Sequence, residues 1–142
     1  MKKIGLIVAF FVLFLINGCF LNKDVDNEIT NVNTRQTPTS HTVLITDNGF
    51  EPKTLTIKQG DTVVWVNKGE LNSWPASAIH PTHDAYPEPG GCSGSKFDAC
   101  KELATDDSWE FTFNYKGTWS YHDHIKLGAR ASGDWTGKII VE

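Results

Sequence analysis

The sequence predicts one small all-β domain built as a β-sandwich. Short runs rich in Val, Ile, Thr and aromatic residues alternate with Gly, Asn and Pro turn signals, and no segment has the apolar spacing of a helix. Five Trp and eight Phe residues supply enough large side chains for one core. Several short strands at regular spacing, with turns between them, are typical of a sandwich.

The strongest strand signal is the run 62–67, which contains three valines and a tryptophan and follows a Gly60-Asp61 turn. Residues of these types favour a pleated, half-buried strand. Leu55 and Ile57 alternate with polar residues, which is the pattern of a strand with one buried face. By these criteria the expected strands span 42–46, 50–52, 54–58, 62–67, 109–114, 118–124 and 136–141.

The first eighteen residues are expected to be an export signal and not part of the folded domain. Lys2 and Lys3 form a positive start, and 4–16 is an apolar run of thirteen residues. A membrane-spanning helix needs roughly 20 apolar residues, so this run is too short to cross a bilayer. Its flanks are those of a secretory signal, and we therefore expect the protein to leave the cytoplasm.

The end of this segment resembles a bacterial lipoprotein signal, in which a small residue precedes a cysteine that becomes lipidated. Gly18 and Cys19 fit that pattern, which implies a membrane anchor at Cys19; an ordinary secretory signal is the alternative. Residues 19–40 lack an apolar period, so we expect a flexible tether that reaches on the order of 25 Å before a domain at 41–142. We expect His41, at the edge of this tether, to be solvated and to bind no metal.

The charge balance of the exported part excludes one class of partner. Removing residues 1–18 from the 142 leaves 124, and the 13 basic residues fall to 11 because Lys2 and Lys3 are lost, against 17 acidic residues. The formal charge is then about −6, whereas a nucleic-acid-binding surface must be basic. We therefore expect no nucleic-acid partner.

Two cysteines remain in the exported part, Cys92 and Cys100. Outside the cytoplasm a disulfide between them is the favoured interpretation, and a thiolate metal site is the alternative. By the chain-entropy estimate, closing this nine-residue loop contributes roughly 2.5 kcal/mol to stability.

Four of the five histidines fall in two short motifs. In an extended strand, His122 and His124 share one face, while Asp123 points to the other. His80 and His83 lie in a long loop upstream. Imidazole is the commonest borderline metal ligand, so the four residues suit copper or zinc; solvated surface histidines are the alternative.

Four strand and turn segments carry a family resemblance: Phe50-Glu51-Pro52, Gly60-Asp61-Thr62-Val63-Val64-Trp65-Val66-Asn67, Gly117-Thr118-Trp119-Ser120-Tyr121 and Gly137-Lys138-Ile139-Ile140-Val141. Through these segments the chain from 42 to 142 resembles the cupredoxin family of small copper-binding proteins. The resemblance implies a Greek-key β-sandwich.

The ligands of a blue copper site in that family are missing from this sequence. Such a site uses two histidines and a cysteine thiolate, usually with a weak axial methionine. Asp123 stands where the family's cysteine is expected, and the sole methionine is Met1. Ser73 and Trp74 occupy the region where the first family histidine is expected. An ordinary blue site is therefore not expected.

The histidine motifs are similar to those of another cupredoxin branch, the multicopper oxidases. His80-Pro81-Thr82-His83 resembles their His-Pro-x-His motif, and His122-Asp123-His124 resembles their His-Cys-His triplet with aspartate in place of cysteine. Only the outer histidines of that triplet can be carried over. The motifs, with Trp74-Pro75-Ala76-Ser77, also resemble those of exported single-domain cupredoxin-like proteins.

The leading functional hypothesis is a membrane-tethered copper protein, with zinc as the alternative metal. His80, His83, His122 and His124 would be the ligands, and Asp123 would orient its neighbours or act as a further ligand. The protein would serve in copper handling or electron transfer, with a redox or copper-transfer protein as partner. Two alternatives stay open: a metal-free interaction module, and a copper oxidase whose site is shared between subunits.

Overall fold

The computed structural model describes residues 37–127 and 134–142 of the chain. The predicted export signal, the lipidated Cys19 and most of the predicted tether lie outside the described residues. Every strand described below belongs to the compact unit 35–142. Within the described residues, no helix could span a membrane.

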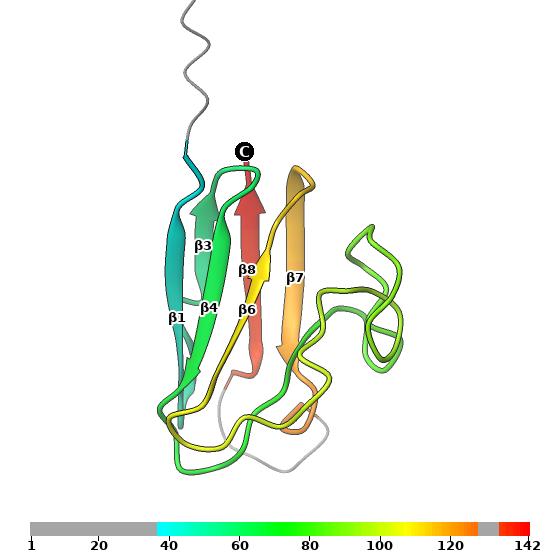
Figure 1. The fold of residues 1–142 in the computed structure, drawn as a ribbon. Helices are drawn as coiled ribbons and strands as arrows, with labels where there is room; N and C mark the ends of the chain where they lie inside the picture. Colours follow the sequence, from blue (N-terminus) through cyan, green and yellow to red (C-terminus); the bar gives the residue numbers. More distant parts are fainter. Residues whose placement is uncertain (1–36, 128–133) are drawn as a thin grey trace, which may run out of the picture. The chain divides into compact units, whose positions relative to one another are not determined.

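The described strands form two four-stranded sheets, as the sequence predicts for a β-sandwich. The first sheet has the order β2-β1-β4-β6 and the second has the order β3-β8-β7-β5. Figure 1 labels β1, β4 and β6 of the first sheet and β3, β8 and β7 of the second. Parallel pairs, β1 with β4 and β3 with β8, occur beside antiparallel ones. The strands are β1 (Ser40–Thr46), β2 (Gly49–Glu51), β3 (Thr54–Ile57), β4 (Thr62–Asn67), β5 (Pro75–Ser77), β6 (Ser108–Thr112), β7 (Gly117–Asp123) and β8 (Thr136–Val141).

Seven of the eight strands lie where the sequence predicts strands, within one or two residues at each end. The strand missing from the prediction is β5, which has three residues and begins with a proline. Strand β5 is nevertheless completely buried, because it lies between β7 on one side and the segment 97–99 on the other. This short strand positions the candidate site.

The core of the sandwich is centred on Trp65 of β4, whose side chain is completely buried. Its ring lies 5.5 Å from that of Phe97, 5.1 Å from that of Trp109 and 5.4 Å from that of Tyr121. Trp109 belongs to β6 in the first sheet and Tyr121 to β7 in the second. The Trp65 ring therefore joins the two layers of the sandwich, and aromatic side chains dominate the energy of such a core.

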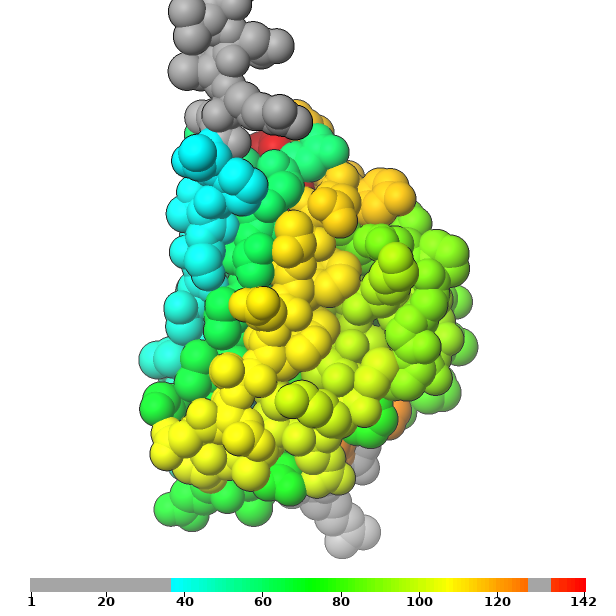
Figure 2. Space-filling view, viewed as in Figure 1, coloured from blue at the N-terminus to red at the C-terminus, as the bar shows by residue number. Residues whose placement is uncertain are grey.

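The long connection from β5 to β6, residues 78–107, packs beside the strands (Figure 2). It contributes two fully buried rings to the core, those of Tyr86 and Phe97. The predicted disulfide between Cys92 and Cys100 is confirmed within this connection. Because the segment is fixed by core packing and by a covalent cross-link, it can hold functional side chains at defined positions.

The prediction that His41 is a solvated terminal residue is wrong. His41 lies within β1 and is partly buried, because Nε2 of its ring makes a 2.9 Å ion pair with the Asp61 carboxylate. Asp61 also accepts hydrogen bonds from the backbone N–H groups of Thr39 and Lys58. Burial raises the pKa of Asp61, but these hydrogen bonds and His41 together outweigh burial and lower it. The pair anchors the start of β1, and β1 itself begins at Ser40, one residue before the predicted domain start.

Gly137 of β8 allows the Tyr121 ring to lie directly over the neighbouring strand. The two residues are cross-strand partners, and a side chain at position 137 would overlap the Tyr121 ring. The absence of a Cβ is therefore required for the packing of a ring that itself contacts Trp65.

We predict that Gly137→Ala lowers the free energy of unfolding by about 1–3 kcal/mol, because the added methyl group overpacks the core. Lys138→Ala, an exposed change on the same strand, is the control and should shift stability by less than about 0.5 kcal/mol. Denaturant unfolding of both variants measures the difference. Equal stability of the two would show that the core accommodates the extra carbon.

Candidate metal centre

The structure brings the four motif histidines together at the end of β7. His122 lies on β7, and His124 follows directly after it. His80 and His83 come from the connection that leaves β5, the neighbour of β7 in the sheet. The two motifs thus meet because their strands are paired.

One ring nitrogen from each of the four imidazoles lies within 4.8 Å of the others. Nδ1 of His80 is 3.3 Å from Nε2 of His122, and Nδ1 of His124 is 2.8 Å from Nε2 of His83. Nitrogen atoms at these separations can share one ion at the metal–nitrogen distances of zinc and copper proteins, about 2 Å. The arrangement is a candidate site for a single metal ion.

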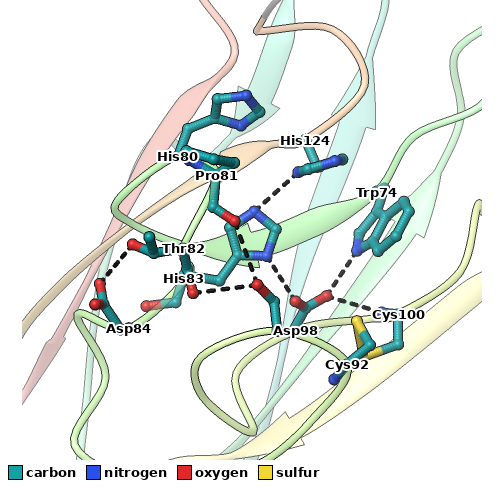
Figure 3. Close-up of polar contacts among 12 residues, drawn as sticks. Trp74, His80, Pro81, Thr82, His83, Asp84, Cys92, Asp98, Cys100 and His124 are labelled. Carbon is teal, nitrogen blue, oxygen red and sulfur yellow. Dashed lines mark hydrogen bonds and ion pairs between the residues drawn. A yellow bond between two sulfur atoms is a disulfide. The ribbon is translucent and has the colours of Figure 1, made fainter.

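Asp98 fixes the orientation of His83. The His83 ring and the Asp98 carboxylate are both buried, and Nδ1 of the ring lies 2.6 Å from a carboxylate oxygen (Figure 3). The other oxygen accepts hydrogen bonds from the Trp74 indole at 2.7 Å and from the Cys100 backbone N–H at 2.9 Å. With Nδ1 committed to Asp98, Nε2 of His83 is the nitrogen that faces the other imidazoles. A carboxylate behind a histidine is the usual partner of a metal-ligating ring.

Backbone pairing places Asp98 beside the cluster. The segment 97–99 continues the second sheet beyond β5, through a backbone hydrogen bond from Ser77 to Phe97 at 2.8 Å and one from Ala99 to Pro75 at 3.0 Å. Asp98 is therefore opposite Ala76, which in turn is opposite His122. Side chains opposite one another share a face, so Asp98 and His122 both project from the outer face of the second sheet.

His83 has a backbone φ of +53°, in the left-handed region that non-glycine residues rarely adopt. Its N–H donates a 2.7 Å hydrogen bond to the Ile79 carbonyl, which closes a tight turn between the two histidines of this motif. Such conformations cost on the order of 1 kcal/mol and concentrate at functional sites. Here the turn directs both imidazoles toward β7.

The cluster is closed on one side and open on the other. His83 and His122 are buried, His124 is partly buried against the Trp74 ring at 4.6 Å, and His80 is exposed. Solvent therefore reaches the imidazoles from the side of His80.

Asp123 takes no part in this cluster, because it lies on the inner face of β7, as the strand alternation predicts. It is completely buried and accepts a hydrogen bond from the Ser73 hydroxyl at 2.5 Å. Two further hydrogen bonds, from the N–H groups of Ile125 and Lys126, close the turn that leads from β7 into the His124 segment. Asp123 thus positions its neighbours in the structure.

Sequence reasoning missed Lys126 and Asp98. The Lys126 ammonium group is buried, 3.6 Å from the Asp123 carboxylate and 4.2 Å above the centre of the Trp135 ring. At the inner position where the resemblance places a metal-binding cysteine, the chain therefore has a buried ion pair. No pattern marks Lys126; Asp98 lies inside the disulfide loop, which could have drawn attention to it.

Two of the clustered imidazoles, His122 and His124, resist protonation. Burial, followed by the neighbouring His83, His80 and His124, lowers the pKa of His122 to about 4. Burial and the same neighbours also lower the pKa of His124. Both rings are consequently neutral near pH 7, which is the form that binds a metal.

Comparison with protein-family models and with curated proteins gave no match. Solved structures do match. A purple cupredoxin from Nitrosopumilus maritimus is 19% identical with a TM-score of 0.51, covering 72% of this chain and 99% of that one. An oxidised amicyanin mutant, in which leucine replaces a methionine, is 22% identical with a TM-score of 0.53, covering 72% and 81%. A Cu(I) amicyanin mutant, in which glutamine replaces the same methionine, is 21% identical with a TM-score of 0.54, covering 72% and 82%.

The described part of the chain is therefore an all-β sandwich with the cupredoxin fold, as the sequence predicts. Within it, a cluster of four histidines forms a possible metal site on the outer face of the second sheet.

We predict that the metal-free protein loses stability as the pH falls from about 6.5 toward about 4. In this window the unfolded chain protonates His122, whose ordinary pKa is 6.5, whereas the folded protein does not. The unfolded state then binds more protons, so the free energy of unfolding decreases with decreasing pH.

Denaturant unfolding of metal-free protein between pH 7.5 and pH 4.5 measures this effect, with His122→Gln as the comparison. The variant should show a flatter pH profile. Profiles that coincide would show that His122 titrates normally in the folded state.

Proposed function

We propose that this protein binds one copper ion through His80, His83, His122 and His124. The observation that carries the proposal is the convergence of four imidazoles, one of them held by a buried carboxylate. A closely packed group of four imidazoles has little value as a structural core, because the buried nitrogens are desolvated and only some can hydrogen-bond to one another. A bound cation would satisfy all four nitrogens.

Copper suits this ligand set better than most divalent metals. Imidazole is a borderline ligand, and affinity for such sites increases along the first-row series to Cu(II). Zinc is the main competitor, since it also accepts four nitrogen ligands. The cupredoxin fold supports copper, and the donor set allows either ion.

For the biological role we propose copper handling or electron transfer on the outer side of a membrane, with a redox or copper-transfer protein as the partner. The exposed His80 supports an exchange role, because one ligand can be reached from solvent while the other rings stay in place. An oxidase with a site completed by another subunit is the enzymatic alternative.

We predict that the purified protein binds one Cu(II) ion tightly. The double variant His122→Ala/His124→Ala should lose tight binding, and His80→Ala/His83→Ala should weaken it by at least about 100-fold, because two of the four ligands are removed in each case. Metal analysis after dialysis and a competition titration give stoichiometry and affinity.

The matched control is His41→Ala, which removes the one histidine outside the cluster and should leave copper binding unchanged. Circular dichroism establishes that each variant is folded. Unchanged affinity in a folded variant lacking all four cluster histidines would refute the proposed site and favour a metal-free interaction module.

We predict that the copper-loaded protein lacks the intense blue colour of a copper–thiolate site. That colour requires a cysteine ligand, whereas Cys92 and Cys100 are bonded to each other. A visible spectrum and an electron paramagnetic resonance spectrum of the Cu(II) form should show a nitrogen-dominated site. An intense band near the blue-copper region would show that a cysteine reaches the metal.

Lipidation of Cys19 is our proposal for how the protein is held at the membrane. The proposal depends on the short apolar run and on the Gly18-Cys19 pair, in the part of the chain outside the described residues. A lipid anchor on a flexible tether would keep the folded domain within a short distance of the membrane surface.

We predict that the native protein fractionates with membranes and that Cys19→Ser either releases it or leaves the precursor uncleaved, because the lipidated residue is lost. Immunoblotting of membrane and soluble fractions is the measurement. A wild-type mature protein found wholly in the soluble fraction would contradict lipid anchoring and favour an ordinary secretory signal.

A further inference from the structure

A pocket of about 480 Å³ opens directly beside the histidine cluster, on the outer face of the second sheet. His80 and His122 form one of its walls. Of these two candidate ligands, His80 is exposed and His122 is buried. A molecule in this pocket would therefore be next to a metal held by the four imidazoles.

Strand register explains why the pocket is polar on its floor. Lys138 of β8 is opposite Ser120 of β7 and also opposite Thr54 of β3. The next row contains Thr136 and His122. Residues two apart along a strand face the same side and are separated by about 7 Å. The cross-strand pair that contains Lys138 is therefore adjacent, on the same face, to the pair that contains His122.

Lysine side chains give the pocket its charge. Among the described residues that line it, Lys53 and Lys138 are the charged ones, and none is acidic. Lys53 is already ion-paired with Asp134, whereas no carboxylate of the described residues pairs with Lys138. The ammonium group of Lys138 is therefore available to a bound anion, and a metal ion at the cluster would add further positive charge.

The other wall of the pocket is apolar. It includes Ala78 and two exposed hydrophobic side chains, Ile79 and Leu127, which are 66% and 42% exposed. The volume is in the range of sites for small organic molecules, about 300–1,000 Å³, and far exceeds what a two- or three-atom anion requires. The lining thus fits a molecule with an anionic end and an apolar body.

Metal geometry supplies the remaining step. Cu(II) with four nitrogen ligands can accept a further ligand, whereas zinc with four protein ligands is closed. Asp98 lies behind His83 and the Trp74 ring behind His124, whereas His80 and His122 border the pocket, so a further ligand would reach the metal from the side of His80 and His122. That side is the pocket.

We propose that the copper centre keeps one exchangeable coordination position directed into this pocket, and that the pocket binds a small organic carboxylate there. One carboxylate oxygen coordinates the copper, Lys138 balances the negative charge, and the apolar body lies against Ile79 and Leu127. The inference rests on the proposed copper site and adds the ligand class to it.

The test is a titration of the Cu(II)-loaded protein with benzoate at low ionic strength, followed by electron paramagnetic resonance, by the visible spectrum and by calorimetry. We expect a saturable spectral change that fits one site. Lys138→Gln should raise the benzoate dissociation constant by about two- to fivefold, since it removes one charge of an ion pair. Copper stoichiometry should be the same as in the wild type.

The matched control is Lys58→Gln, an exposed lysine that lies outside this pocket and should leave benzoate affinity unchanged. A copper-loaded protein that shows no spectral response to benzoate, or an equal affinity in both lysine variants, would overturn the inference while leaving the copper site intact. A response to azide but not to benzoate would also overturn it, because the position would then accept small anions only. Protein that fails to bind copper at all would refute the proposed function, and the inference with it.

Discussion

The buried Asp98 carboxylate is the interaction on which the candidate centre depends. It accepts a short hydrogen bond from His83, and it joins that ring to the Trp74 indole and to the Cys100 backbone. The carboxylate is placed by the pairing of its own segment with β5 and by the disulfide loop that contains it. The Asp98 side chain therefore links the sheet register and the disulfide to the orientation of the His83 imidazole. Burying a carboxylate is costly unless its oxygens accept hydrogen bonds. Both oxygens of Asp98 do so, one from His83 and the other from the Trp74 indole and the Cys100 backbone N–H.

The two faces of β7 carry side chains with different roles: those on the inner face stabilise the fold, and His122 on the outer face belongs to the candidate metal centre. On the inner face, Tyr121 packs into the aromatic core, and Asp123 forms a buried ion pair with Lys126. On the outer face, His122 belongs to the imidazole cluster. Asp123 thus occupies the interior position that the cupredoxin resemblance assigns to a copper-binding cysteine. Lys126 balances its negative charge. The candidate metal site is consequently not a modified blue copper site but a separate group of ligands on the opposite side of the same strand.

The differing exposure of the imidazoles bears on the role of the site. His83 and His122 are buried and therefore fixed, whereas His80 is reached by solvent and borders the pocket. A rigid, closed ligand set suits a metal that only changes its redox state, while an accessible ligand and an open position suit a metal that is exchanged or that binds another molecule. The described geometry is closer to the second case, which connects copper handling with the carboxylate pocket.

The sequence by itself determined the fold class, most strand positions, the disulfide and the two histidine motifs, because alternation, turn residues and cysteine spacing are local properties. It did not reveal β5, whose three residues are buried through contacts with distant segments. It also did not reveal Asp98 and Lys126, or that His41 pairs with Asp61. Those roles arise from strand pairing between segments that are far apart in the chain, and only the tertiary structure decides which face, which neighbour and which pocket each side chain meets.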